Sequence, residues 1–374
     1  MPKPKVVLFI IHSLQGGGAE RVMSNLMHQA SLDPTLDVHL ALIHDTREYP
    51  VPANVTVHTL DKPRTGLGPK LLGQLYAATA LVRVVKDVKP VSMLAFMPRA
   101  NSIALAGKLL CKTWPSVTIS ERTSPLQQYT GATARLVRFA IKHLYRFADH
   151  IVAVSSEVKS ELELIGAPSF KITHIPNPLN LAHIQMQGEN IAEAHNWATH
   201  KDGHVLIVAA GRLDPEKGFD VLIRALALLK DTLKFRVLIF GKGREAKSLK
   251  LLGNELLGDL IEFPGFWSNT FATIKLADVF ILSSRVEGTP NVLLEAQSLG
   301  VPCIATKCGG VADVMTDASG MLVDIGNTAQ MAEAIYTMLT DSSRFNIYGA
   351  IGQEIMQAHS ADIIWARYRE LLVP

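Results

Sequence analysis

Short apolar segments rich in valine and isoleucine alternate along the chain with longer segments whose apolar residues recur at helical spacing. We predict strands at 6–11, 38–43, 117–120, 151–155, 205–210, 235–240, 279–283 and 302–306. Apolar strands that alternate with helices are typical of parallel sheets buried on both faces. The pattern therefore predicts an α/β fold with helices on both faces of its sheets.

The alternation of strand and helix occurs twice, on either side of a turn-rich junction. Pro176 and Pro178 lie in this junction, where each removes a backbone donor and disfavours helix. A length of 374 residues also favours about two domains. We predict an N-terminal domain at 1–178, a C-terminal domain at 179–355, and a final helix within 356–374 that docks back on the N-terminal domain.

The composition sets several classes of protein aside. Charged residues make up 19% of the chain, which does not describe a disordered protein. No apolar run approaches the roughly 18 residues of a membrane-spanning helix, and the first apolar run is too short for a signal-peptide core. We therefore expect a cytoplasmic protein. Its cysteines, Cys111, Cys303 and Cys308, offer neither an even set for disulfides nor a metal-binding spacing.

Charge is distributed unevenly between the two predicted domains. Residues 1–178 carry 20 Lys and Arg against 12 Asp and Glu, a net charge of +8, whereas residues 179–374 carry 17 against 22, a net charge of −5. Such asymmetry suggests that the first half faces an anionic partner. Nucleic acid is a poor candidate, because aromatic residues are only 6% and no known reader module is recognisable.

Ligands of open parallel sheets bind beyond the carboxyl ends of the strands, so the loops at these ends hold the candidate chemistry. The first strand leads into the glycines 16–18 just before a helix, where Gly17 and Gly18 let a phosphate or sugar approach the backbone. A tight strand-to-helix turn would have the same sequence. In the second domain, Arg212 and Lys217 flank a turn after strand 205–210, where together they could neutralise a diphosphate.

Two glutamates lie near the beginning of a predicted helix after strand 279–283. Pro290 suits its first turn and Gly300 suits the position after its end, which predicts a helix of about ten residues. Glu287 then precedes this helix, and Glu295 lies inside it. Backbone N–H groups near Asn291 and Val292 could receive a phosphate, with a carboxylate on each side for sugar hydroxyls.

Taken together, these motifs resemble glycosyltransferase family 4, retaining nucleotide-sugar enzymes of the GT-B architecture. The resemblance rests on the glycine loop at 16–18, the Arg212 and Lys217 pair, the Phe263-Pro264-Gly265-Phe266 loop and the E-x7-E spacing of Glu287 and Glu295. It implies two Rossmann-like domains with parallel sheets and an interdomain cleft. It also implies donor-binding roles for Gly17, Gly18, Arg212, Lys217, Gly241, Phe266, Trp267, Gly288, Thr289, Asn291, Val292 and Glu295.

Within this resemblance, individual roles can be assigned. Arg212 and Lys217 would hold the donor diphosphate, and Glu287 would contact the transferred sugar. Glu295 would bind the ribose hydroxyls, and the loop at Phe266 and Trp267 would hold the base. Many family members have a histidine where this chain has Glu121 and Arg122, so these two become acceptor-side catalytic candidates.

The sequence 288–291, Gly-Thr-Pro-Asn, resembles a bacterial branch that includes N-acetylgalactosaminyl transferases acting on lipid-linked sugars. The resemblance thus implies transfer of an N-acetylhexosamine from a UDP-linked donor to a lipid-diphosphate saccharide in surface glycan biosynthesis. No DxD motif occurs, so we expect neither a metal nor another cofactor, with leaving-group charge met by Arg212 and Lys217. A sugar-nucleotide epimerase or a phosphorylase of similar architecture is the alternative.

Basic residues in the first domain suggest how such an acceptor is reached. Arg135, Arg138, Lys142 and Arg146 fall on one face of a predicted helix, and Lys62, Arg64 and Lys70 precede another. Solvated helix faces would explain this pattern. The alternative is adsorption to an anionic membrane, which would place the protein peripherally on the inner face of the cytoplasmic membrane.

Overall fold

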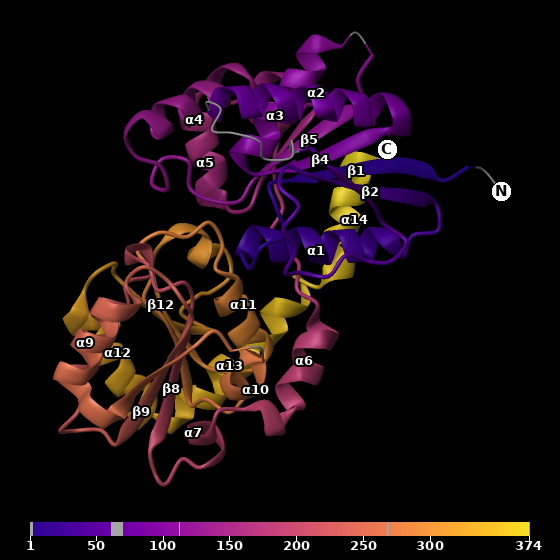
Figure 1. The fold of residues 1–374 in the computed structure, drawn as a ribbon. Helices are drawn as coiled ribbons and strands as arrows, with labels where there is room; N and C mark the ends of the chain where they lie inside the picture. The colour runs from indigo at the N-terminus through magenta and orange to yellow at the C-terminus, as the bar shows by residue number, and fades with distance from the viewer. Residues whose placement is uncertain (1–2, 61–69, 112, 268, 374) are drawn as a thin grey trace. The chain divides into compact units, whose positions relative to one another are not determined.

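The computed structural model describes residues 3–60, 70–111, 113–267 and 269–373, which form two compact units (Figure 1). Unit 1 comprises Met1–Pro178 and Ala361–Pro374, and unit 2 comprises Leu179–Ser360. The first boundary falls at the junction rich in proline. The second falls after Ser360 and not at 355, because helix α13 (Ser342–Gln357) continues past that point within unit 2.

Unit 1 is built on a seven-stranded, fully parallel sheet with strand order β3-β2-β1-β4-β5-β6-β7. The strands are β1 (Lys5–Ile11), β2 (Leu36–Leu42), β3 (Thr56–Thr59), β4 (Ser92–Phe96), β5 (Ser116–Glu121), β6 (His150–Ala153) and β7 (Ile172–His174). The helices are α1 (Gly18–Ser31), α2 (Lys70–Val88), α3 (Met97–Leu110), α4 (Gly131–His143), α5 (Ser156–Ile165) and α14 (Ala361–Leu372).

Alternate residues of β1, β2, β4 and β6 enter two different cores of unit 1. Along β1, Leu8 and Ile10 pack with α2 to α5, whereas Val7, Phe9 and Ile11 pack with α1 and α14. Figure 1 accordingly shows α14, in yellow, beside α1 on one face of the sheet. The last helix of the chain thus belongs to unit 1, where Trp365 and Tyr368 are buried.

Unit 2 repeats the plan with a six-stranded parallel sheet of order β10-β9-β8-β11-β12-β13. Its strands are β8 (Val205–Ala210), β9 (Phe235–Phe240), β10 (Ile261–Gly265), β11 (Val279–Leu282), β12 (Cys303–Thr306) and β13 (Gly320–Val323). Besides α13, the helices are α6 (Leu181–Glu189), α7 (Asn196–Thr199), α8 (Phe219–Ala227), α9 (Ala246–Leu257), α10 (Thr270–Lys275), α11 (Asn291–Ser298) and α12 (Thr328–Thr340).

The strand order reverses direction once in each sheet. In unit 1 the reversal lies between β1 and β4, and in unit 2 it lies between β8 and β11. The loops that follow these strands diverge to opposite faces of the sheet, which leaves a crevice where ligands of open α/β sheets bind. The fold therefore singles out the loops after β1, β4, β8 and β11.

Each of the eight predicted strands is present in the structure. Five observed strands were not predicted: β3, β4, β7, β10 and β13. All but β4 are partly exposed or short, and β4 is a five-residue buried segment that runs directly into α3. Within the described residues, no helix combines the length and apolarity that crossing a membrane requires.

Candidate functional site

Hydrogen bonds join the loop that follows β8 to the loop that follows β11. The backbone N–H of Arg285 donates to the Glu216 carbonyl over 2.7 Å, and Ser283 Oγ donates to the Lys217 carbonyl over 2.9 Å. Gly218 has a φ of +61°, and a Cβ there would lie 2.1 Å from the Ser283 carbonyl oxygen. Only glycine fits this approach, so the turn that presents Lys217 is fixed by its neighbour.

At the centre of these loops Lys217 forms an ion pair with Glu287. The distance from Lys217 Nζ to Glu287 Oε1 is 2.6 Å, and Ser284 Oγ donates to the same oxygen over 2.7 Å. Both side chains of the pair are largely buried, at 17% and 9% exposed. Partial burial strengthens such a pair relative to one in water, so two predicted residues from distant segments are held together in one place.

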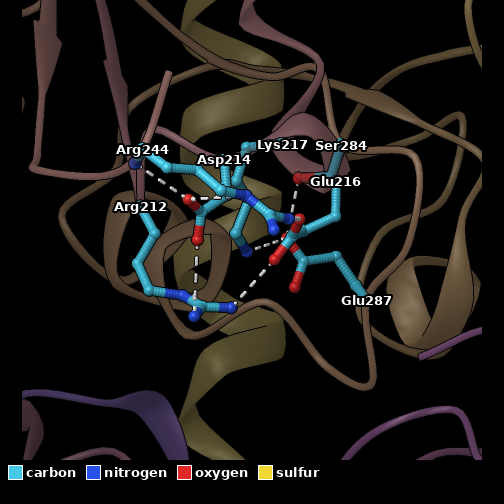
Figure 2. A network of polar contacts seen from close by, with 7 residues as sticks. All are labelled: Arg212, Asp214, Glu216, Lys217, Arg244, Ser284 and Glu287. Atoms are coloured by element: carbon cyan, nitrogen blue, oxygen red, sulfur yellow. Dashed lines mark hydrogen bonds and ion pairs between the residues drawn. The ribbon is translucent and has the colours of Figure 1, made fainter. Parts of the chain in front are cut away.

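Arg212 lies at the open edge of this cluster. It is 61% exposed and pairs with Glu216 over 3.0 Å and with Asp214 over 3.5 Å. Arg244, which follows β9, reaches the same two carboxylates at 3.4 and 3.5 Å. Figure 2 shows the resulting alternation of cations and carboxylates. Both guanidinium groups are largely exposed, although their carboxylate partners are not, so each guanidinium is accessible to an anionic ligand.

Arg244 was not among the predicted site residues. Its segment, 241–248, has Ala246 where a Walker A loop has its second glycine, so it does not complete that phosphate-binding motif. Its position after β9, next to β8 in the sheet, was the available signal.

The loop and helix after β11 hold the remaining residues of the E-x7-E motif. Helix α11 begins at Asn291, with Pro290 in the capping position before it, and Gly300 has a φ of +75° after its end. The helix has eight residues, somewhat fewer than predicted. Glu295 is buried at 3% exposed, and Glu287 precedes the helix.

The backbone of Glu287 and Gly288 rests on the loop after β12. Gly310 N–H donates to the Gly288 carbonyl over 2.8 Å, and a Cβ on Gly309 would lie 2.0 Å from the Glu287 carbonyl oxygen. With Thr289 also buried, this approach fixes the backbone from which the Glu287 side chain reaches Lys217.

Gly241 and the aromatic loop lie at the ends of the neighbouring strands β9 and β10. Gly241 donates its N–H to the Gly265 carbonyl over 2.8 Å, and a Cβ there would lie 1.8 Å from the Gly211 carbonyl oxygen. Phe266 is 67% exposed. Trp267, in contrast, donates its indole N–H to the Glu193 carbonyl over 3.0 Å and packs on the aromatic core. Of the two aromatics, Phe266 is the more exposed, and Lys242 Nζ lies 5.6 Å from the centroid of its ring.

Gly17 and Gly18 lie where the sequence placed them, between β1 and α1. Gly18 is the first residue of α1 and Gly17 is its N-cap, with an extended φ of −105°. A Cβ on Gly17 would lie 2.2 Å from Glu20 Oε2, the end of a flexible side chain. The loop is therefore a tight strand-to-helix turn that also presents a helix N-terminus.

Glu121 and Arg122 occupy the interior of unit 1. Glu121 is 0% exposed, and burial raises its pKa to about 7 although hydrogen bonds from Tyr145 and Asn101 oppose the shift. Arg122 is 6% exposed and donates to Tyr368 of α14 over 3.1 Å and to Asn177. Both side chains hold protein elements together in this structure, and their catalytic roles stay predictions.

The predicted basic helix face is shorter than expected. Arg135, Arg138 and Lys142 are exposed on α4, but the helix ends at His143 and Arg146 lies in the following 3-10 turn (Tyr145–Phe147). The prediction that all four share one helix face is therefore wrong for Arg146. Of the other basic positions, Lys62 and Arg64 lie outside the described residues, as does the side chain of Lys70.

The two units define a two-domain α/β fold of the GT-B type. HepE of Anabaena, solved in complex with UDP and glucose, matches the structure with a TM-score of 0.81 at 20% identity, covering 98% of both chains. This similarity confirms the predicted GT-B fold with two Rossmann-like domains.

Comparison of sequences shows the family. Residues 190–354 match the model described as Glycosyl transferases group 1, and residues 16–183 match Glycosyltransferase Family 4. The N-acetylgalactosamine-N,N'-diacetylbacillosaminyl-diphospho-undecaprenol 4-alpha-N-acetylgalactosaminyltransferase of Campylobacter jejuni is 31% identical over 346 residues, 90% of this chain and 91% of the relative. The chain belongs to the glycosyltransferase family, as its motifs predicted.

A second Campylobacter jejuni protein is similar over a comparable length. It is the GalNAc-alpha-(1->4)-GalNAc-alpha-(1->3)-diNAcBac-PP-undecaprenol alpha-1,4-N-acetyl-D-galactosaminyltransferase, 26% identical over 343 residues, 90% of this chain and 89% of the relative. Both relatives are named for transfer to an undecaprenol diphosphate saccharide.

Proposed function

We propose that this chain transfers an N-acetylhexosamine, N-acetylgalactosamine first among the candidates, from a UDP-linked donor to a lipid-diphosphate-linked saccharide, with retention of anomeric configuration, in surface glycan biosynthesis. The observation that carries the proposal is the ion pair between Lys217 and Glu287 at the strand-order reversal of unit 2. The names of the two Campylobacter relatives support the sugar and the acceptor, and the ligands of HepE support the nucleotide.

The cations of the site suit a departing diphosphate. As the glycosidic bond to the diphosphate breaks, negative charge grows on its oxygens, and Lys217 and Arg212 are positioned to stabilise it. Arg244 adds a third cation that shares the carboxylates of Arg212. These side chains together with helix dipoles supply the stabilisation, and the proposal needs no metal.

Retention follows from attack on the same face as the leaving group. The departing diphosphate oxygen takes the proton of the acceptor hydroxyl while that hydroxyl bonds to the anomeric carbon. Glu287 binds the sugar in this scheme. Its carboxylate already accepts from Lys217 and Ser284, which makes it a poor nucleophile and favours the positioning role.

Donor binding tests the proposal directly. Isothermal titration of UDP-N-acetylgalactosamine into the full chain should give binding that weakens about tenfold or more in Lys217→Ala and in Glu295→Gln, the expected loss for a hydrogen bond to a charged group. Lys250→Ala, an exposed lysine on α9, is the matched control and should bind as the parent does. Undiminished binding in both site variants would refute the site.

Membrane association is the second part of the proposal. Leu136 and Phe139 of α4 are 69% and 61% exposed beside Arg135, Arg138 and Lys142, although helices of soluble proteins normally bury such residues. Apolar side chains flanked by cations suit the interface of an anionic membrane. This arrangement supports a peripheral location on the inner face of the cytoplasmic membrane.

Co-sedimentation with vesicles tests the membrane contact. The chain should bind phosphatidylglycerol vesicles and dissociate as salt rises. Replacement of Arg135, Arg138 and Lys142 by Gln should weaken binding about a hundredfold, at about 1 kcal/mol for each cation. The control replaces Lys247 and Lys250, exposed on α9, by Gln. Equal binding of neutral and anionic vesicles would contradict the proposal.

A further inference from the structure

Three basic side chains meet at the strand-order reversal of unit 1, and none of them is among the predicted site residues. His12 follows β1 directly, His44 follows β2, and Arg99 lies in the first turn of α3 after β4. The strands β2, β1 and β4 are neighbours in that order, so their carboxyl ends bring the three residues together. The location is the one at which open α/β sheets bind ligands.

The guanidinium of Arg99 lies against both imidazoles. Arg99 Nη1 is 3.3 Å from His12 Nδ1 and 3.5 Å from His44 Nε2, and the two rings meet edge to face with centroids 4.7 Å apart. A guanidinium only donates hydrogen bonds, so the ring nitrogens that face it act as acceptors. The imidazole rings therefore support the arginine but supply no negative charge to neutralise it.

The charge of Arg99 is not compensated within the part of the chain that the structure describes. No described carboxylate forms an ion pair with it, and its buried Nε has no hydrogen-bond partner there. Nearby Arg47, in contrast, donates two hydrogen bonds to Asp45 at 2.6 and 2.8 Å. A half-buried guanidinium without a counter-ion lowers the stability of the folded state unless an anion binds to it.

The hydrogen-bond contacts of Arg99 are long, so a ligand could replace them. Charge-assisted N–H to O bonds are usually about 2.8 Å, shorter than the 3.3 and 3.5 Å seen here. The backbone also turns sharply at this point, because Met97 has a φ of +75°, a region that a residue with a Cβ rarely adopts. Such backbone strain is concentrated at functional sites.

We infer that Arg99, flanked by His12 and His44, binds a phosphoryl group of the acceptor. The inference rests on the proposed function for the identity of the acceptor, whose diphosphate is the phosphoryl anion that this unit has to recognise. Arg99 supplies the charge and a planar set of donors that matches phosphate oxygens. The imidazoles orient the guanidinium and line the site.

The test measures binding of inorganic pyrophosphate and of geranyl diphosphate, a short lipid diphosphate, to the full chain carrying Lys217→Ala. This background removes the main buried cation of unit 2. Adding Arg99→Gln should weaken both probes about tenfold or more. Arg99→Lys should retain part of the affinity, because it keeps the charge without the planar donors. Arg83→Gln, an exposed arginine on α2, is the control and should remain within twofold.

Imidazole NMR signals give a second measurement. The ring signals of His12 and His44 should shift on titration with pyrophosphate and should not shift in Arg99→Gln. Unchanged affinity in Arg99→Gln, or rings that do not respond, would overturn the site. Arg99-dependent binding of pyrophosphate alone would overturn its assignment to a lipid headgroup.

The outcome is separable from that of the proposed function. With Lys217 intact, Arg99→Gln should bind UDP-N-acetylgalactosamine as the parent does. If donor binding fails in the parent while pyrophosphate binding depends on Arg99, the proposed function is wrong and the anion site stands. If donor binding is normal and Arg99 has no effect on either probe, the anion site is wrong.

Discussion

Glu121 gives a quantitative prediction because burial of its carboxyl group outweighs the hydrogen bonds and the nearby charge of Arg122 that favour the ionised form. Its Oε1 accepts hydrogen bonds from Asn101 over 2.9 Å and from Tyr145, whereas the buried Oε2 has no partner among the described residues. Burial raises its pKa from 4.5 to about 7. Replacing the group by a neutral side chain of the same shape, Glu121→Gln, should remove the cost of ionising it.

The size of the effect follows from the two pKa values, 4.5 for the exposed group and about 7 in the folded chain. Between them the folded chain binds more protons than the unfolded chain, so the free energy of unfolding falls as pH rises through this window. At 1.36 kcal/mol for each pKa unit the full difference is about 3 kcal/mol, most of which falls between pH 5 and 8.5. The free energy of unfolding of Glu121→Gln should therefore rise by that amount relative to the parent over this pH range.

Urea unfolding followed by tryptophan fluorescence measures this difference. The background is Trp197→Phe with Trp267→Phe, so that Trp114 and Trp365 remain and report on unit 1. Subtracting the parent curve at each pH removes the contributions of all groups that the two chains share.

The matched control is Glu163→Gln, an exposed glutamate on α5 of the same unit. This control should change the free energy of unfolding by less than about 0.5 kcal/mol at any pH, as is usual for substitutions of exposed side chains. If the difference in free energy of unfolding between Glu121→Gln and the parent changes by less than about 0.5 kcal/mol between pH 5 and 8.5, the conclusion that burial raises the pKa of Glu121 is refuted.

Two further predictions concern the turn of unit 2 and the last helix. Gly218→Ala should lower the free energy of unfolding by about 1–3 kcal/mol in urea titrations, because a Cβ would meet the Ser283 carbonyl. The control is Gly258→Ala, at a glycine that also has a positive φ but open space around it, and this variant should lose less free energy of unfolding. Equal losses in the two variants would count against the steric argument. Arg122→Met should raise hydrogen exchange in α14 by about tenfold or more, because its hydrogen bond to Tyr368 is lost; an unchanged exchange rate would show that apolar packing alone holds the helix.

Much of the fold could be predicted from local pattern. Strands β8 and β9 begin and end at the predicted residues, because continuous valine and isoleucine segments between helices have few alternatives. Strand β4, Ser92–Phe96, escaped prediction because it is short, contains no β-branched residue and passes into α3 without a turn. The end of α4 was also misplaced, since the basic spacing continues past His143 while the helix does not.

The amino-acid sequence by itself determined the α/β class, the two-domain plan and the loops with Arg212, Lys217, Glu287 and Glu295, because these follow from local periodicity and from motifs within short segments. Only the tertiary structure decided which distant segments meet. Parallel strands joined by helical crossovers can be ordered in many ways, and the observed order is what brings Arg99 between two histidines and Lys217 onto Glu287. It also decided burial, and so revealed that the carboxyl group of Glu121, a predicted acceptor-side residue, is enclosed.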